Sequence, residues 1–483
     1  MKNLRKKVML GFAWNSIGVV LNQILSVIIN VVLARILVPE DFGVVAMLSI
    51  FIQLSLRLQG AGLGESLIRK KEVSQEEYNF VFYYSFLIGL ASYLIFYFSA
   101  PLIADFYSEP KLIWITRIIT LNLILIPLDG INRTQLVKKL DFKTITIVQT
   151  IAIIVSGTVG IIMAYTNCGV WSLVGQNLCL YFISMTVFII LNRWLPTISF
   201  DKKKSISLIG FGSKLMVANY LQIAFANIYS VIIGKQYTAG DLGFYAQGMK
   251  LQRIPSQSIT SIIQMVSFPA FANIRDDKTK YLTAFRKTMK LMTFLNFPLL
   301  ICLSAIADPL IPFALSEKWI KTIPFFQMLM VIGLLEPIKS LFINILKVEG
   351  KAGLLINYIM ITKIFYLIGI LITFKMSIYA IVISQILATF LELIIFSNIG
   401  KLIGYTKKDI LKDIFPNLLL ALLIGAALFS FNSLHLLNTV FTLLFDFMIG
   451  IFLFCLISYV AKNSSFFEIK QELTLVLKRK RDA

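Results

Sequence analysis

The sequence predicts an all-α integral membrane protein with about fourteen transmembrane helices, in two parallel six-helix lobes followed by two C-terminal helices. Composition is the first observation behind this class. Hydrophobic residues make up 58% of the 483 residues and charged residues 15%, and the mean hydropathy is +0.81. A soluble domain carries about 25% charged residues. The chain therefore cannot present an ordinary aqueous surface, and its solvent is a bilayer.

Internal repetition is the second observation. A Pro-Leu-Ile triplet followed four residues later by Ser-Glu occurs at residues 101–109 and again at 309–317, a shift of 208. Further pairs recur at shifts of 200 and 210: Asp41 with Asp241, Gly43 with Gly243, Ala46 with Ala246, Pro127 with Pro337, and Leu136 with Leu346. Small drifts in spacing are expected of two diverged copies of one unit, and such duplication is frequent in transporters.

The apolar stretches give the predicted elements in order. A spanning helix needs roughly 20 apolar residues, and such stretches begin near positions 8, 42, 79, 112, 144, 168, 205, 242, 288, 322, 352, 376, 411 and 436. The first runs over 8–37, which is too long for a cleavable signal and lacks a small-residue cleavage site, so it should remain as a helix. The predicted domains are a lobe over 1–195, a cytoplasmic linker over 196–204, a second lobe over 205–405, and two extra helices with a basic tail over 406–483.

Charge predicts the orientation. The net charge is +21, and most of the 46 Lys and Arg residues fall in the N-terminus, the even-numbered loops and the C-terminus. This asymmetry predicts that both termini are cytoplasmic. Segments one and seven then start on the same side, so the two repeats are parallel about an axis along the membrane normal. Membrane lipids are expected partners of the basic clusters. Nucleic acid is not, because no aromatic-rich soluble module accompanies the charge.

Soluble-enzyme chemistry has little support in this sequence. The four cysteines all lie in apolar stretches without CxxC spacing, and the chain has one histidine. We therefore expect no disulfide framework, no metal site, no catalytic residues and no cofactor.

Charged residues inside the apolar stretches predict the functional site. Each costs about 2.5 to 3.5 kcal/mol at the centre of a membrane helix. Arg117 and Arg133 lie near helix ends and can snorkel to the interface. Six other cations lie deeper: Arg57, Lys214, Lys250, Arg253, Lys339 and Lys363.

Carboxylates inside the apolar stretches could pair with some of these cations. The carboxylates are Asp129, Glu336, Glu392 and Asp446, and Glu336 precedes Lys339 by three residues, a spacing at which side chains meet on one helix face. Pairing would still leave an excess of positive charge, which predicts an anionic cargo.

Polar residues concentrate in the first two helices of each lobe, where they would line a cavity. Gln53 lies four residues before Arg57, and Asn219 lies five residues after Lys214. Amides suit sugar hydroxyls, and Arg or Lys suits phosphate. Hydrogen bonding between helices is the alternative explanation for these amides. Gly60, Gly62 and Gly64 should loosen or bend the second segment.

Three motifs carry a family resemblance: GFAWN at 11–15, LVPEDFG at 37–43, and GAGLG at 60–64 leading to IRKK at 68–71. With the whole-chain plan, they resemble the polysaccharide flippases of the multidrug/oligosaccharidyl-lipid/polysaccharide exporter superfamily, in the O-antigen and teichuronic acid exporter branch. The resemblance implies alternating-access export of undecaprenyl-diphosphate-linked oligosaccharide repeat units, which are the expected substrate, with a glycan polymerase as an expected partner.

The resemblance also bears on the site and on the driving force. Arg57 and Arg253 match positions at which such flippases carry cavity arginines. Coupling to a proton or sodium gradient is implied, with Asp129 and Glu336 as candidate carboxylates, although segment one has no acidic residue. Two alternatives stay open: a multidrug or cation antiporter of the same fold, which needs an acidic aromatic pocket, and a membrane polysaccharide polymerase or ligase, which needs a large external loop.

Overall fold

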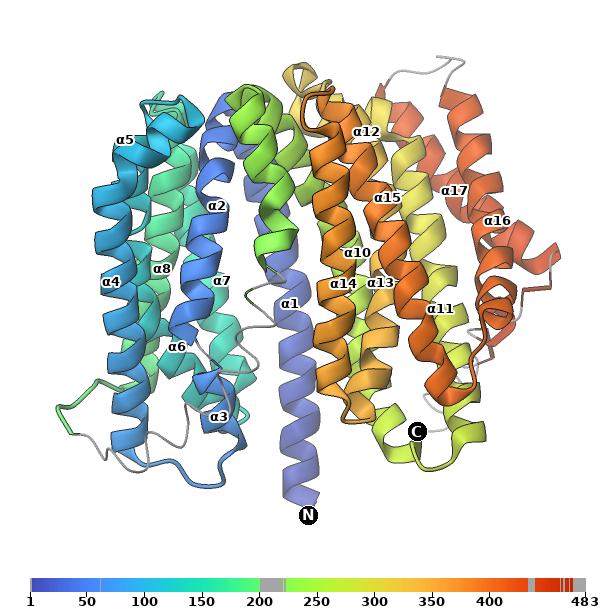
Figure 1. Ribbon diagram of the computed structural model, residues 1–483, viewed down its shortest axis with the longest axis horizontal. Coiled ribbons are helices and arrows are strands. Elements are labelled where there is room, and N and C mark those ends of the chain that lie inside the picture. Colours follow the sequence, from blue (N-terminus) through green and yellow to red (C-terminus); the bar gives the residue numbers. More distant parts are fainter. Residues whose placement is uncertain are drawn as a thin grey trace. The chain divides into compact units, whose positions relative to one another are not determined.

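The computed structural model describes residues 2–60, 62–199, 220, 223–432, 439–460, 462–463, 465–468 and 470–471, and all the regular secondary structure in these ranges is helical (Figure 1). Eleven helical stretches there are long and apolar enough to cross a membrane. They coincide with eleven of the fourteen predicted segments. The segment predicted near 205 begins outside the described residues. The one near 242 is α10, which is rich in Gln and Ser, and the one near 436 is α17, described from Thr439. The predicted all-α membrane class is confirmed.

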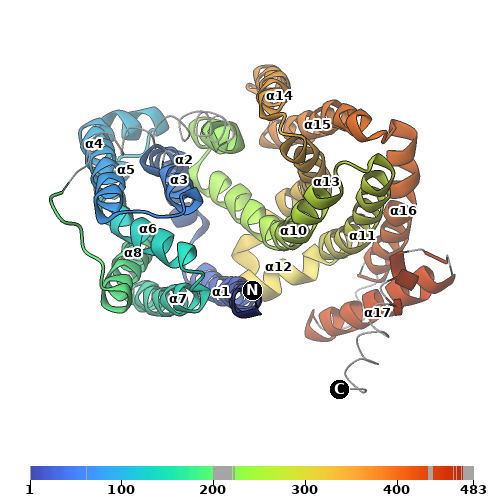
Figure 2. The ribbon, with the colours of Figure 1, turned by 90° about the horizontal axis from the view of Figure 1, so that it is seen from below.

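Residue contacts divide the chain into two compact units, Met1–Ala246 and Gln247–Ala483. In the first unit, α7 packs against α1 and α8, α6 packs against α8 and α4, and α2 packs against α4 and α8 (Figure 2). A further helical stretch covers 223–236. The helices of this unit are α1 (Lys2–Ile36), α2 (Pro39–Gly60), α3 (Leu63–Arg69), α4 (Gln75–Tyr107), α5 (Leu112–Ile119), α6 (Asn122–Lys138), α7 (Phe142–Tyr165) and α8 (Val170–Asn192).

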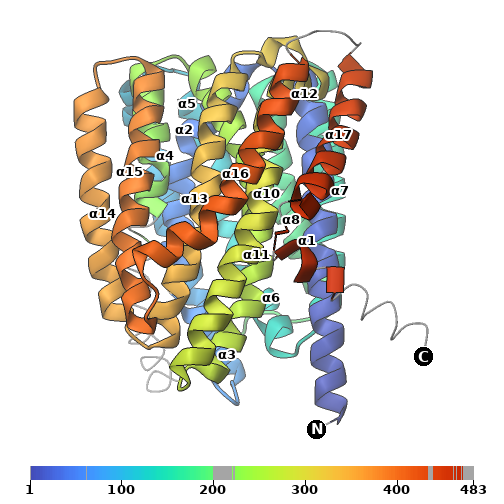
Figure 3. The ribbon, with the colours of Figure 1, turned by 90° about the vertical axis from the view of Figure 1, so that its right-hand side faces the viewer.

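The second unit begins within α10. Here α11 packs against α13 and α16, α15 packs against α13 and α14, and α17 lies beside α16 (Figure 3). A buried aromatic cluster that includes Phe271, Phe285, Phe342 and Tyr405 joins several of these helices. The helices are α10 (Ala239–Ile274), α11 (Lys278–Ala305), α12 (Ala307–Leu315), α13 (Thr322–Val348), α14 (Ala352–Thr373), α15 (Ile378–Ser397), α16 (Lys407–Asn432) and α17 (Thr439–Val460).

The repeated residues take the same local roles in both copies. Ser108 and Ser316, the serines of the duplicated motif, each follow a helix and adopt positive φ, 56° and 90°. Pro127 and Pro337 each lie buried inside a helix. The copies differ in continuity: one unbroken helix, α4, contains Pro101, whereas the helix of the second copy is interrupted at Ile306, before α12.

The repeated Asp-x-Gly motif begins corresponding helices, and its two copies meet. The Oδ2 atom of Asp41 accepts from the backbone N–H of Val38 at 3.3 Å, and that of Asp241 accepts from Thr238 at 3.3 Å. A Cβ atom at Gly43 would lie 1.7 Å from the carbonyl oxygen of Ala239, and one at Gly243 would lie 2.0 Å from that of Pro39. Glycine is therefore required at both positions, because the two helix starts cross with their backbones in contact.

Glycines also interrupt the second segment, as predicted. α2 ends at Gly60, and Gly62, with φ of 69°, precedes the short helix α3. The linker residues 200–204 lie outside the described residues, so the predicted boundaries of the two lobes stay a prediction.

Candidate functional site

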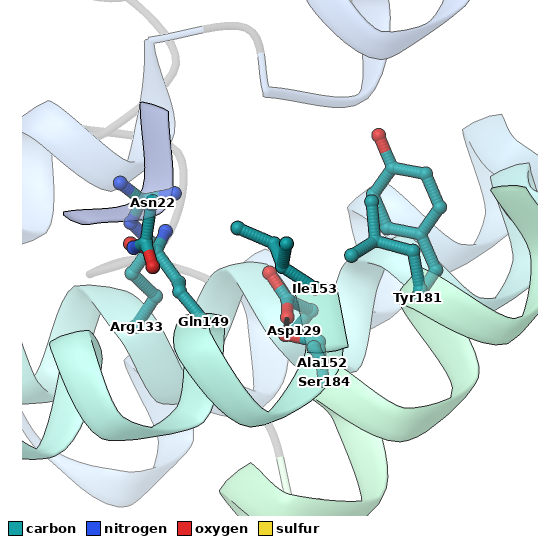
Figure 4. A pocket seen from close by; sticks show the side chains of 9 residues that line it. Asn22, Asp129, Arg133, Gln149, Ala152, Ile153, Tyr181 and Ser184 are labelled. Carbon is teal, nitrogen blue, oxygen red and sulfur yellow. Dashed lines mark hydrogen bonds between the residues drawn. The ribbon is translucent and has the colours of Figure 1, made fainter. Parts of the chain in front are cut away.

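A cavity of about 240 Å³ lies within the first unit, among α1, α6, α7 and α8. Its polar lining is Asn22, Asp129, Arg133, Gln149, Tyr181 and Ser184, and Figure 4 shows the carboxylate of Asp129 between the polar group around Arg133 and the ring of Tyr181. One carboxylate, one guanidinium, two amides and two hydroxyls thus surround a space large enough for several water molecules.

Asp129, a predicted coupling residue, is held in place by local contacts. The Ser184 hydroxyl donates to its carboxylate. Arg133 follows it by one helical turn on α6, the spacing at which a cation and an anion meet on one helix face. On the other side of the cavity, Asn22 accepts from the Thr150 hydroxyl at 2.9 Å and donates to Gln149 at 3.5 Å. The Asp129 carboxylate can exchange a proton, whereas the Arg133 guanidinium in the same lining counts against an organic cation.

Arg57 lies in the last turn of α2 and is exposed. Within the described part of the chain, no hydrogen bond or ion pair involves its guanidinium. Gln53, one turn earlier, exchanges hydrogen bonds with the Asn227 amide at 3.4 and 3.5 Å. Interhelical bonding thus accounts for Gln53 in this structure, whereas Arg57 requires water or an anion.

The predicted cations of α10 lie in the second unit. Lys250 is exposed and Arg253 is half-buried. The Arg253 guanidinium, like that of Arg57, makes no hydrogen bond or ion pair with the residues that the structure describes. Pro255 lies inside the same helix two residues later and removes one backbone donor there.

Lys339 and Lys363 converge on one buried carboxylate. Their Nζ atoms lie 3.2 Å from the two oxygens of Glu392 on α15, which is 2% exposed. The Tyr366 hydroxyl donates to the same carboxylate at 2.9 Å. Lys339 therefore pairs across helices with Glu392 and not with Glu336 on its own helix, the partner that sequence spacing favoured. Glu336, half-buried one turn before Lys339, adds a second negative charge near both lysines, so the charges of this cluster are close to balanced.

The remaining predicted cations divide into three cases. Lys214, with the predicted polar residue Asn219, lies outside the described residues. Arg117 has a structural role, since its guanidinium stacks over Tyr97 at 4.6 Å and Trp114 at 5.1 Å and donates to the Tyr97 carbonyl at 3.3 Å. Arg133, which sequence reasoning placed at the interface by snorkelling, lines the cavity instead.

Three cavity residues were not predicted from sequence. Gln149 is a lone amide in an otherwise apolar stretch of α7, and Tyr181 and Ser184 are three residues apart on α8, so they share a helix face. The three-residue spacing of Tyr181 and Ser184 was the one sequence pattern that indicated a shared polar face. It does not distinguish a cavity wall from an ordinary helix contact.

Residues 32–324 match the sequence family described as polysaccharide biosynthesis protein, over more than half of the chain. The chain belongs to this family. Curated relatives include the lipopolysaccharide biosynthesis protein WzxC of Escherichia coli, 25% identical over 73% of this chain and 72% of that protein. The teichuronic acid biosynthesis protein TuaB of Bacillus subtilis is 24% identical over 79% and 78%. The succinoglycan biosynthesis transport protein ExoT of Rhizobium meliloti is 26% identical over 69% and 67%.

Solved structures place this family member in a known fold. A lipid II flippase, MurJ, in its inward closed conformation superposes with a TM-score of 0.72, covering 93% of this chain and 99% of that chain at 15% identity. An inward-facing multidrug resistance transporter of the MATE family gives 0.63, covering 80% and 96% at 12% identity. The family member is therefore a multi-pass membrane protein with the fold of these transporters.

Proposed function

We propose that this protein is a flippase that moves undecaprenyl-diphosphate-linked oligosaccharide repeat units across the bacterial cytoplasmic membrane by alternating access. The intramembrane cations carry the proposal. Arg57 and Arg253 make no hydrogen bond or ion pair with the described residues. A diphosphate supplies the missing negative charge, and Arg matches its oxygens in bidentate geometry. Family membership supports the class of cargo.

The cargo can be tested with the purified full-length protein in lipid vesicles. We expect it to move a fluorescent undecaprenyl-diphosphate oligosaccharide between leaflets, measured by its access to an added quencher, and to leave the matching undecaprenyl glycan without diphosphate in place. Protein-free vesicles are the control. Transport of an organic cation such as ethidium, with no movement of the glycan lipid, would instead show that the protein is a cation antiporter.

We infer that the driving ion acts at Asp129. In the vesicle assay, a proton or sodium gradient should accelerate movement of the glycan lipid, and Asp129→Asn should remove the acceleration while downhill movement continues. The reason is that Asn keeps the shape of Asp129 but can neither take up a proton nor neutralise a cation. Asp308→Asn, at an exposed position on α12, is the matched control. If the Asp129→Asn variant responded to the gradient as the wild type does, Asp129 would be excluded as the coupling residue.

We propose that both termini are cytoplasmic, as the charge asymmetry predicts. The test uses a background in which Cys168, Cys179, Cys302 and Cys455 are replaced. In intact cells, a cysteine at position 108 or 316 should react with an impermeant thiol reagent, whereas one at position 74 should react only after the cells are opened. Labelling of position 74 in intact cells would show that the orientation is the opposite one.

We expect the exported unit to pass to a glycan polymerase on the outer side.

A further inference from the structure

A second buried acidic site lies in the C-terminal helix pair, apart from the cations and the cavity described above. Asp446 is the only Asp, Glu, Lys, Arg or His on α17, and it is 1% exposed. Membrane helices rarely carry such a residue without a function, because burying its charge is costly.

The described helices around α17 bring mainly apolar side chains to it. α17 packs against α16 and α12, and its side chains Ile449 and Leu453 join a buried cluster with Phe294, Ala305 and Leu428. The charged residues of α16 end at Asp413, and those of α11 end at Lys290. Asp413 is nineteen residues before Asn432, or roughly 28 Å along a helix.

The titratable side chains on the same parts of the packed helices do not supply a cation. They are the half-buried thiol of Cys302 on α11 and the exposed Asp308 on α12; on α17 itself, Cys455 and Tyr459 are exposed. His435 lies between α16 and α17, outside the described residues.

The hydrogen-bonding atoms of Asp446 are unsatisfied. Neither carboxyl oxygen makes a hydrogen bond of good geometry in the described structure, although the Asn432 side chain lies beside the carboxyl, and Oδ1 of Asn432 is likewise buried without a partner. The Asn432 amide nitrogen donates one of its two hydrogens to the Ala305 carbonyl at 3.4 Å. One proton on Asp446 resolves this arrangement, because a carboxylic acid can donate to Oδ1 of Asn432 whereas a carboxylate cannot.

Asp413 shows how the same unit stabilises a buried carboxylate that is charged. It is 2% exposed, and two nitrogens of Arg286 donate to it at 2.8 and 2.9 Å. The Tyr405 hydroxyl donates at 3.2 Å, and burial raises the pKa of that hydroxyl, so it stays a donor. Asp446 has none of these partners among the described residues, and an isolated buried carboxylate neutralises instead of remaining charged.

We propose that Asp446 is a proton-binding site of the α16–α17 pair. The carboxyl is protonated while α17 is packed as described, and its proton is shared with Asn432. Losing the proton leaves a bare carboxylate in an apolar contact, so deprotonation weakens the packing of α17. This inference does not rest on the proposed cargo.

Infrared spectroscopy of the full-length protein in vesicles tests the protonation state directly. The difference spectrum between wild type and Asp446→Asn at pH 7 should contain the carbonyl stretch of a protonated carboxylic acid. The difference for Asp413→Asn should contain only carboxylate bands. Carboxylate bands alone in the Asp446 difference spectrum, for example from pairing with His435, would overturn the proposal.

Thermal unfolding gives a second, independent readout. Asp446→Asn mimics the neutral acid, so its Tm at pH 7 should equal or exceed that of wild type. The gap should widen from pH 7 to pH 9, because a group that folds protonated and unfolds ionised loses stability as pH rises. Asp413→Asn should instead lower Tm, by roughly 5 to 10 °C. A similar drop in Asp446→Asn at pH 7 would show that the native carboxyl is charged and paired.

Discussion

Neutralising Arg57 and Arg253 together, as Arg57→Gln with Arg253→Gln, should abolish export of the lipid-linked glycan while leaving membrane insertion intact. Arg57 lies in the last turn of α2 and Arg253 within α10, and both guanidiniums are unpaired among the described residues. Glutamine removes the charge that would hold a diphosphate and lowers the cost of burying the side chain, so insertion should not suffer. Export is measured by surface glycan in a strain that lacks its own flippase, and insertion by the amount of protein in the membrane fraction.

Two further variants make this expectation specific. Lysine at either position should restore export only in part, because its point charge lacks the bidentate fork of Arg. Arg117→Gln is the matched control, since its guanidinium stacks on Tyr97 and Trp114 and should matter only for packing. Wild-type export by the Arg57→Gln, Arg253→Gln variant at normal expression would exclude these arginines from cargo binding.

The membrane-spanning helices and the duplication could be predicted because both depend on patterns that can be read directly along the sequence. Hydropathy over about 20 residues gives the position of each helix. Several repeated residues have a backbone role in both copies: Ser108 and Ser316 adopt positive φ after a helix, and Gly43 and Gly243 allow two backbones to touch. Such constraints act locally and leave a recognisable residue at a fixed position.

The partners of the buried charges could not be predicted in the same way. Sequence gives the depth of a residue in the membrane but not the direction in which its side chain points around the helix axis. Glu336 lies near Lys339 in sequence, yet Lys339 pairs with Glu392 on another helix, fifty-three residues later. The lining around Asp129 likewise comes from four helices, so no local pattern contains it.

Removing the carboxylate that Lys339 and Lys363 share should have the largest effect on stability. Glu392→Gln leaves two ammonium groups close together, with Lys363 only 8% exposed, and no negative charge between them. Deleting one partner of a buried ion pair costs about 3 to 5 kcal/mol, because the remaining charge stays desolvated. We expect a clear loss of Tm in the purified protein and less protein in the membrane.

A double variant separates this structural role from cargo binding by the two lysines. Lys363→Met added to Glu392→Gln should recover part of the lost Tm, since it removes one unpaired cation and retains an apolar stem of similar length. If Lys339 and Lys363 instead exist mainly to hold an anionic cargo, Glu392→Gln should leave Tm of the cargo-free protein unchanged and strengthen binding of the diphosphate lipid. Glu336 lies close enough to act on both lysines, so with Glu392 present the cluster carries as many carboxylates as ammonium groups. The position of both lysines therefore depends on Glu392.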